Sequence, residues 1–412
     1  MARVPQELIN AIIDETNDAP TLGSCALASS RTREHSQRRL FKITPLRLRD
    51  RGYLYQKAIV AAPHLAAYTE ILVIQTRKHW VDRGQDGEDE NKILSHLSNV
   101  RTCILNFSRD AGWSHFQLKL KSVILSFLQR QRPLDEIHIL GGRMEVREFA
   151  ELLASARASR VSFHYSSFEF IRHGNPPSIE KDVPSPPFLA LPRELGTIAL
   201  ELLARSGFFR NTLHLSITLD RTSSERYPQS FGRILQLASE SGTLRRLTLV
   251  VYGRLGEESE LATMDLPNIE YLDFSVQQST ELWTFLAITA LLEREPTTRS
   301  LRRITLTSWG TWGEYIVSQP SEAILRRQQS GVSQQKAIEN LDKALASRAP
   351  LQLLFRLDGT PNVVQAAKRE ITRNMPLSAA LGLITFENYL PPTVLLDRSD
   401  WRVSYYDPWG YI

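Results

Sequence analysis

Three histidines lie inside short apolar stretches and are the residues best suited to chemistry. His138 stands in "EIHIL", His164 in "VSFHY" and His214 in "LHLSI". Side chains alternate along a strand, so hydrophobic neighbours that face a core would leave the imidazoles on the opposite face. An imidazole acts as an acid–base group or metal ligand when a carboxylate lies beside it. Glu136 is the carboxylate nearest in sequence.

Short motifs that identify common active sites are missing from the sequence. It contains no glycine-rich phosphate loop ending in lysine, no H-E-x-x-H, no C-x-x-C and no G-x-S-x-G. Polar alternation on an open sheet face is the simpler explanation for the histidines. We therefore predict no enzyme, no metal and no cofactor. The alternative is an enzyme on an α/β fold, which would need a closed pocket around the histidines.

The composition indicates an intracellular globular protein. Hydrophobic residues make up 42% of the 412 residues and charged residues 23%, which is typical of a chain with a substantial core. No apolar run approaches the roughly 18 residues of a membrane-spanning helix, and the first residues lack the apolar centre of a signal peptide. Cys25 and Cys103 are the only cysteines, as suits a reducing compartment. We expect a cytoplasmic or nuclear protein without membrane contact.

The histidines belong to a pattern that recurs along the chain: a helix, a short turn and an alternating strand of the type L-x-x-L-x-L. Strands are expected within residues 67–75, 98–106, 133–141, 158–165, 211–219, 242–250, 267–276, 299–307, 349–357 and 378–387. Helices are expected at residues 115–131, 144–157, 227–241, 280–295, 334–348 and 362–375, where apolar residues lie three and four apart. Most strand centres are about 24 to 33 residues apart, near or above the leucine-rich-repeat period.

This pattern predicts an α/β fold built as an irregular solenoid, with parallel strands on the concave side and helices on the convex side. It resembles the degenerate leucine-rich-repeat regions of F-box proteins over residues 67–390. A doubly wound α/β domain is the alternative. The proline-rich segment 173–192 is expected to be a loop or a flexible join between two halves, and 82–91 a surface loop. The aromatic segment 391–412 is expected to cap the last repeat or to serve as a binding peptide.

The alternation nominates a target-binding surface on the concave side. Its main residues are Glu136, His138, His164, His214, Arg246, Tyr271, Asp273 and Arg303. Further polar residues of the same strands are Ser162, Ser216, Thr248, Thr305 and Thr307. Arginine and tyrosine are frequent anchors in protein interfaces, so we expect a protein ligand.

The first 45 residues predict three short helices ahead of a connector at 46–66. Pro5 suits a first helical position, and the residues after it carry an apolar stripe. Asn17, Asp18 and Pro20 predict a turn, and Thr21 is a candidate N-cap for the second helix. The third helix is expected from about Thr32 to Leu40. So small a module buries little surface and needs a partner.

The order of these pieces resembles an F-box: a hydrophobic-Pro dipeptide, "ELINAII", a turn with Asp and Pro, "LGSCAL" and a basic stretch ending in "RRLF". The resemblance implies docking on a Skp-type adaptor and, through it, on a cullin ubiquitin ligase. It places ten residues at or under that contact: Val4, Pro5, Leu8, Ile9, Ile12, Ile13, Leu22, Cys25, Leu27 and Ala28. Thr16 and Thr32 depart from the family, which usually has leucine and an aromatic residue there. Loss of a buried aromatic residue would weaken the contact.

Positive charge is concentrated in the last part of this module and just after it. Eight lysines and arginines and two acidic residues lie between Arg31 and Arg51, although the whole chain has a net charge of only +5. Such an excess suits nucleic acid, an acidic partner or simply a solvated helix face. Aromatic residues do not alternate with the arginines as base stacking requires, so we do not expect a nucleic-acid ligand.

The leading interpretation is a substrate receptor of a cullin-type ubiquitin ligase. Its F-box-like module would hold a Skp-type adaptor and its repeat domain would hold a target protein that the sequence does not identify. The alternative is a repeat scaffold whose decayed F-box only covers the first strand.

Overall fold

The computed structural model describes most of the chain in segments. These are residues 4–16, 18–47, 52–75, 88–106, 113, 118–140, 143–164, 169–170, 184–191, 207–220, 234–237, 239–252, 268–277, 281–294, 300–309, 334–357 and 360–388. They divide into two compact units, the first ending at Pro184 and the second beginning at Ser185. This boundary falls inside the proline-rich segment 173–192.

The first unit begins with three helices, α1 (Gln6–Glu15), α2 (Ala19–Ala28) and α3 (Ser30–Phe41). Asp18 rather than Thr21 caps α2, because its carboxylate accepts a hydrogen bond of 2.8 Å from the backbone N–H of Thr21. Pro20 lies in the first turn of α2, where a missing N–H costs nothing. Ser29 caps α3, so this helix also begins before the predicted Thr32.

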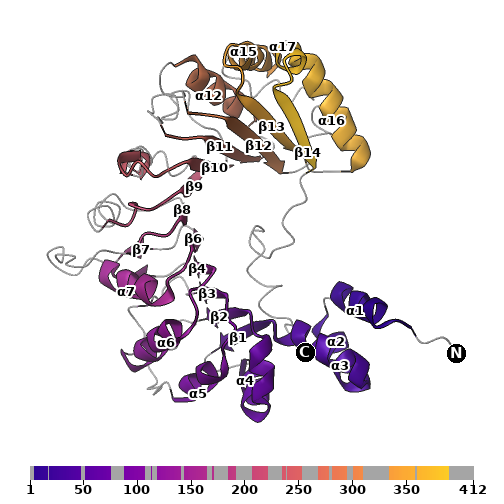
Figure 1. The fold of residues 1–412 in the computed structure, drawn as a ribbon, viewed down its shortest axis with the longest axis vertical. Coiled ribbons are helices and arrows are strands. Elements are labelled where there is room, and N and C mark those ends of the chain that lie inside the picture. Colours follow the sequence, from indigo (N-terminus) through magenta and orange to yellow (C-terminus); the bar gives the residue numbers. More distant parts are fainter. Residues whose placement is uncertain are drawn as a thin grey trace. The chain divides into compact units, whose positions relative to one another are not determined.

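Five parallel strands follow in sequence order in the first unit. They are β1 (Ile43–Arg47), β2 (Ile71–Gln75), β3 (Thr102–Asn106), β4 (Glu136–Leu140) and β6 (Arg160–His164). The connections contain α4 (Gly52–Ala61), the 3-10 helix η1 (Pro63–Tyr68), α5 (Glu88–His96), α6 (Leu118–Arg130) and α7 (Val146–Ala156). The helices α4 to α7 follow one another along one side of these strands (Figure 1). A separate short pair joins β5 (Arg143–Met144) and β7 (Glu169–Phe170).

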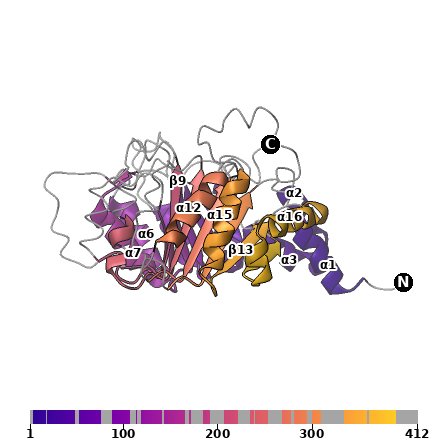
Figure 2. The same ribbon diagram turned by 90° about the horizontal axis from the view of Figure 1, so that it is seen from above.

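The second unit has seven parallel strands, again in sequence order. They are β8 (Phe188–Leu191), β9 (His214–Asp220), β10 (Arg246–Tyr252), β11 (Tyr271–Gln277), β12 (Arg303–Trp309), β13 (Gln352–Leu357) and β14 (Ile384–Asn388). The helices are α12 (Glu281–Glu293), α15 (Gln334–Ala346), α16 (Pro361–Asn374) and α17 (Pro376–Ala380). The pair α12 and α15 lies side by side (Figure 2).

The repeated leucine positions form the core of the second unit. Leu215, Leu247, Leu272, Ile304 and Leu353 occupy register positions on five adjacent strands, and each is fully buried. Every strand contributes one such residue, and burying a large aliphatic side chain is worth about 1.5–3 kcal/mol. No single repeat encloses its leucine, so the row stabilises the unit only when the strands stack.

The predicted α/β class is confirmed at this level, since both units combine a parallel sheet with helices in a solenoid-like arrangement. Each of the ten predicted strand segments overlaps an observed strand. Within the predicted helix 227–241, residues 234–237 and 239–240 are helical. None of the helices in the described segments is both long and apolar enough to cross a membrane.

Some local predictions were wrong. The proline-rich segment contains strand β8, because Leu189 and Leu191 are buried beside β9 and no proline lies within residues 188–191. Helix α5 begins at Glu88, inside the predicted loop 82–91. No secondary structure was predicted for the connector 46–66, which contains helices α4 and η1. The aromatic segment 391–412 lies outside the described residues.

Candidate functional site

Leu8 and Ile12 of helix α1, together with Val4 just before the helix, form what we call the apolar stripe. Leu8 and Ile12 are four residues apart, which places them on one side of α1, whereas Val4 precedes the N-cap Pro5. Their exposed fractions lie between 51% and 66%. Ile13, the next residue along, is buried, so the helix has distinct inner and outer apolar sides. Three large aliphatic side chains are thus offered to solvent together.

Polar contacts between α1 and α3 hold the stripe in this orientation. The guanidinium of Arg31 donates to the carbonyl of Val4 at 2.6 Å, and the amide of Gln6 donates to the carbonyl of Arg31 at 2.8 Å. His35 Nε2 lies 2.9 Å from the carboxylate of Asp14. These contacts join the inner side of α1 to α3. The side chains of the stripe take no part in them.

The two departures from the F-box pattern have structural roles within the helices. The hydroxyl of Thr32 donates to the carbonyl of Cys25 at 2.5 Å and so links α3 to α2. The carbonyl of Thr16 accepts a bond of 3.2 Å from Arg39. Both threonines are half-buried. A polar side chain at position 32 is therefore satisfied locally, without an aromatic residue.

The structure distributes the ten predicted adaptor residues over three environments. Those on the surface are Val4, Pro5, Leu8, Ile12, Leu27 and Ala28. Ile9 and Cys25 are half-buried, and Ile13 and Leu22 are buried. Six of the ten can thus touch a partner directly, whereas the buried pair supports the surface from beneath.

The strands of the second unit carry what we call the polar strand face. It consists of His214, Arg246, Thr248, Tyr271, Asp273, Arg303 and Thr305. These residues occupy alternate positions on β9 to β12, opposite in direction to the buried leucine row. Five of them belong to the eight main predicted target-binding residues, and Thr248 and Thr305 to the further polar residues.

A hydrogen-bonded network crosses three strands of this face. His214 Nε2 lies 2.8 Å from Thr248 Oγ1 on the next strand. Thr248 Oγ1 donates in turn to Asp273 Oδ2 at 3.3 Å. Arg246 Nε donates to the same carboxylate oxygen at 2.5 Å. The guanidinium of Arg303 lies over the ring of Tyr271, 5.3 Å from its centroid.

Three polar atoms at the centre of the polar strand face have no hydrogen-bond partner among the described residues. They are Asp273 Oδ1, Arg303 Nε and Thr305 Oγ1. Asp273 and Thr305 stand opposite each other in the register of β11 and β12. Their residues are only 6% and 1% exposed. Each unpaired buried group costs about 1–3 kcal/mol, and such groups are retained mainly where they have a function.

A smaller polar cluster lies on the strands of the first unit. Glu136 accepts from His138 at 2.9 Å and from Arg160 at 2.5 Å. The hydrogen bond from His138 holds the pKa of Glu136 below its ordinary value, with a further contribution from the charge of Arg160, although partial burial opposes the shift. His138 itself is buried. Arg160 was not predicted, although the alternation that selects Ser162 also selects it.

The three predicted histidines are divided between the two units. His138 is opposite Ser162 in the strand register, and His164 is opposite Leu140. The His164 side chain lies outside the described residues, and His214 belongs to the second unit. Among the described residues, no group of three or more His, Cys, Asp or Glu side chains could hold a metal.

Of the further polar residues, Ser162 and Thr307 are buried and Ser216 is half-buried. Glu136, Arg246, Tyr271 and Arg303 are half-buried too, and can contribute their outer atoms to a contact.

Comparison with known proteins identifies no family for this chain. No protein-family model matches the sequence, and no curated protein matches it. Function must therefore be inferred from the residues themselves.

Proposed function

We propose that this chain is a non-enzymatic substrate receptor of a cullin-type ubiquitin ligase, acting in the cytoplasm or nucleus. In this proposal, helices α1 to α3 dock on a Skp-type adaptor. The observation that carries it is the apolar stripe: Leu8 and Ile12 are exposed on one side of α1 and Val4 is exposed just before the helix, although the core of the module is formed by other residues. Contiguous exposed apolar surface marks interaction sites.

The polar strand face is the proposed target-binding surface. It offers two arginines and a tyrosine, residue types that are frequent at the centre of protein interfaces, beside the buried carboxylate of Asp273. The mechanism is proximity: a target held by the receptor meets the charged ubiquitin carrier at a raised effective concentration. No covalent step is assigned to this chain.

Adaptor binding by stripe variants tests the proposal directly. Leu8→Asp/Ile12→Asp replaces two exposed aliphatic residues, and the matched control is Leu118→Asp/Leu213→Asp, because these leucines are 83% and 50% exposed without lying on α1. Pull-down and calorimetry with a purified Skp-type adaptor should show binding by the wild type and the control and none by the stripe variant. Equal binding by all three proteins, or none by the wild type, would contradict the proposal.

A second candidate is a repeat scaffold whose N-terminal helices only cover the first strand. It is favoured by the contacts of α3 with η1 and β1, which a cap would also make. In that case the wild type does not bind the adaptor, and deletion of residues 1–45 lowers the thermal unfolding temperature of the remainder. A deletion variant that keeps the wild-type melting temperature would exclude the cap.

A further inference from the structure

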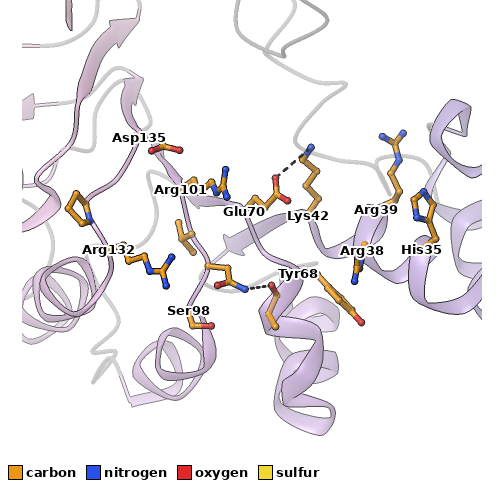
Figure 3. A pocket seen from close by; sticks show the side chains of 14 residues that line it. His35, Arg38, Arg39, Lys42, Tyr68, Glu70, Ser98, Arg101, Arg132 and Asp135 are labelled. Atoms are coloured by element: carbon orange, nitrogen blue, oxygen red, sulfur yellow. Dashed lines mark hydrogen bonds and ion pairs between the residues drawn. The ribbon is translucent and has the colours of Figure 1, made fainter. Parts of the chain in front are cut away.

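The first unit contains an open groove at the amino ends of its strands, which we call the basic groove. Its volume is about 830 Å³. Helix α3 forms one wall with side chains at the spacing of a single helix face, namely His35, Arg38, Arg39 and Lys42. The segments that lead into β2, β3 and β4 form the rest, and Figure 3 shows Arg101 and Arg132 among them.

Charges alternate along the floor of the basic groove. Each strand is directly preceded by a charged residue: β1 by Lys42, β2 by Glu70, β3 by Arg101 and β4 by Asp135. Their backbones are fixed by ladder hydrogen bonds, such as Arg101 N–H to the Glu70 carbonyl at 2.8 Å and Asp135 N–H to the Arg101 carbonyl at 2.9 Å. Neighbouring strands are about 4.8 Å apart, so the four side chains form a row of closely spaced charges.

Positive charge exceeds negative charge in this groove. Five lysines and arginines line it against the carboxylates Glu70 and Asp135, an excess of three. Lys42 forms an ion pair with Glu70, in which its Nζ lies 3.7 Å from the carboxylate. Arg101 and Arg132 are exposed and form no ion pair within the described residues.

The corresponding row of the second unit shows that such pairing is geometrically possible. There Glu270 stands before β11 between Arg245 and Arg302, which stand before β10 and β12. Its carboxylate lies 3.7 Å from Arg245 and 3.4 Å from Arg302. Arg101 has an acidic residue on each side as well, yet pairs with neither. Its charge is therefore available to a ligand.

We propose that the basic groove binds an acidic segment of a partner polypeptide. Carboxylates of the partner would pair with Arg101 and Arg132, while Glu70 and Asp135 would accept a lysine or backbone N–H groups between them. A nucleic acid fits less well, because it carries a phosphate at every residue and would meet both carboxylates. Tyr68 is the only phenyl or indole ring among the described lining residues, and Arg38 already lies over it, 5.7 Å from its centroid.

The basic groove shares no residue with the apolar stripe or the polar strand face, so this inference goes beyond the proposed function. Failure of adaptor docking leaves the basic groove unaffected, and failure of the groove experiment leaves adaptor docking unaffected.

Fluorescence anisotropy of a labelled Asp/Glu-rich peptide with the full chain tests the inference. The groove variant is Arg101→Glu/Arg132→Glu. The control, Arg33→Glu/Arg147→Glu, makes the same change in net charge at two exposed arginines outside the groove. We expect at least about tenfold weaker peptide binding by the groove variant, because two attractions become repulsions, and binding within about twofold of wild type by the control. Arg101→Lys/Arg132→Lys should retain most of the affinity.

Three results would overturn the inference. The first is no peptide binding at low salt, where exposed charges attract most strongly. The second is an equal loss in the groove and control variants, which would mean non-specific attraction by net charge. The third is tighter, groove-dependent binding of a single-stranded oligonucleotide of the same charge. Circular dichroism verifies folding, and Arg101→Gln/Arg132→Gln replaces the reversal variant if that protein misfolds.

Discussion

Ile12 and Ile13 are neighbours on α1 with opposite environments, and the same substitution at each should have different consequences. Ile12 is 66% exposed and belongs to the apolar stripe, whereas Ile13 is 3% exposed and packs beneath it. Ile12→Ala and Ile13→Ala remove the same atoms from the same helix. Any difference between the variants therefore reports environment rather than chemistry.

Ile13→Ala should destabilise the helical module by about 2–3 kcal/mol, because it removes buried methyl and methylene groups and leaves a cavity. A free-energy change of this size accelerates amide hydrogen exchange in α1 by roughly 30- to 150-fold if exchange follows local opening. Ile12→Ala loses no buried contact and gains slightly in helix propensity, so its exchange rate should stay within about twofold of wild type.

For adaptor affinity, the substitution of the exposed Ile12 should be the one that matters directly. Full burial of the Ile12 side chain on docking is worth about 0.8 kcal/mol for each methyl or methylene group that alanine lacks. Ile12→Ala should therefore bind the adaptor roughly 10- to 50-fold more weakly at unchanged stability, as measured by titration calorimetry. Equal amide exchange rates in the two variants would refute the assignment of Ile13 to a buried side of α1 and of Ile12 to an exposed side. Unchanged adaptor affinity in Ile12→Ala would refute docking through the stripe.

Three further results are expected. The hydrogen bond from His138 depresses the pKa of Glu136, so the ionised carboxylate stabilises the fold above the ordinary pKa of about 4.5, and this stabilisation is lost as the pH falls through the lower pKa of the folded state. Glu136→Gln should therefore be less stable than wild type in urea at pH 7, and the difference in stability should shrink towards pH 3. Burial raises the pKa of Cys103 to about 12, so iodoacetamide at pH 8 should modify half-buried Cys25 and spare Cys103 until the protein is unfolded, as peptide mass spectrometry would show. Asp273→Asn removes the charge that pairs with the neighbouring arginine and should cost about 1–2 kcal/mol in urea unfolding, whereas an unchanged midpoint would contradict a buried ion pair.

The positions of the strands could be predicted from the sequence because the buried and exposed sides of a strand follow from the alternation of its own residues. In "TLRRLTLV" and "NIEYLDFSV", alternate apolar residues identify the buried side without knowledge of the neighbours. The same alternation selected Asp273 and Thr305 for the polar strand face. Helices such as α15 were accessible for a similar reason, since their apolar residues recur at helical spacing.

Elements whose identity depends on a neighbour were missed. Strand β8 consists of only four residues after a proline-rich stretch, and β9 beside it supplies the hydrogen-bonding partners that make it a strand. Helix α5 starts in an acidic, glycine-bearing stretch, and its apolar residues Ile93 and Leu94 are buried only after folding. Such segments have weak local preferences, so tertiary contacts decide their conformation.

By itself, the sequence determined the α/β class, the order of the ten predicted strands and the alternation of apolar and polar residues along them, because these follow from periodicity within a few residues. Only the tertiary structure decided which polar residues meet. Parallel pairing brings residues about 25 to 35 positions apart to neighbouring strands about 4.8 Å apart, and one step in register would change every partner. The unpaired atoms around Asp273 and the basic groove between α3 and Arg132 arise from that register.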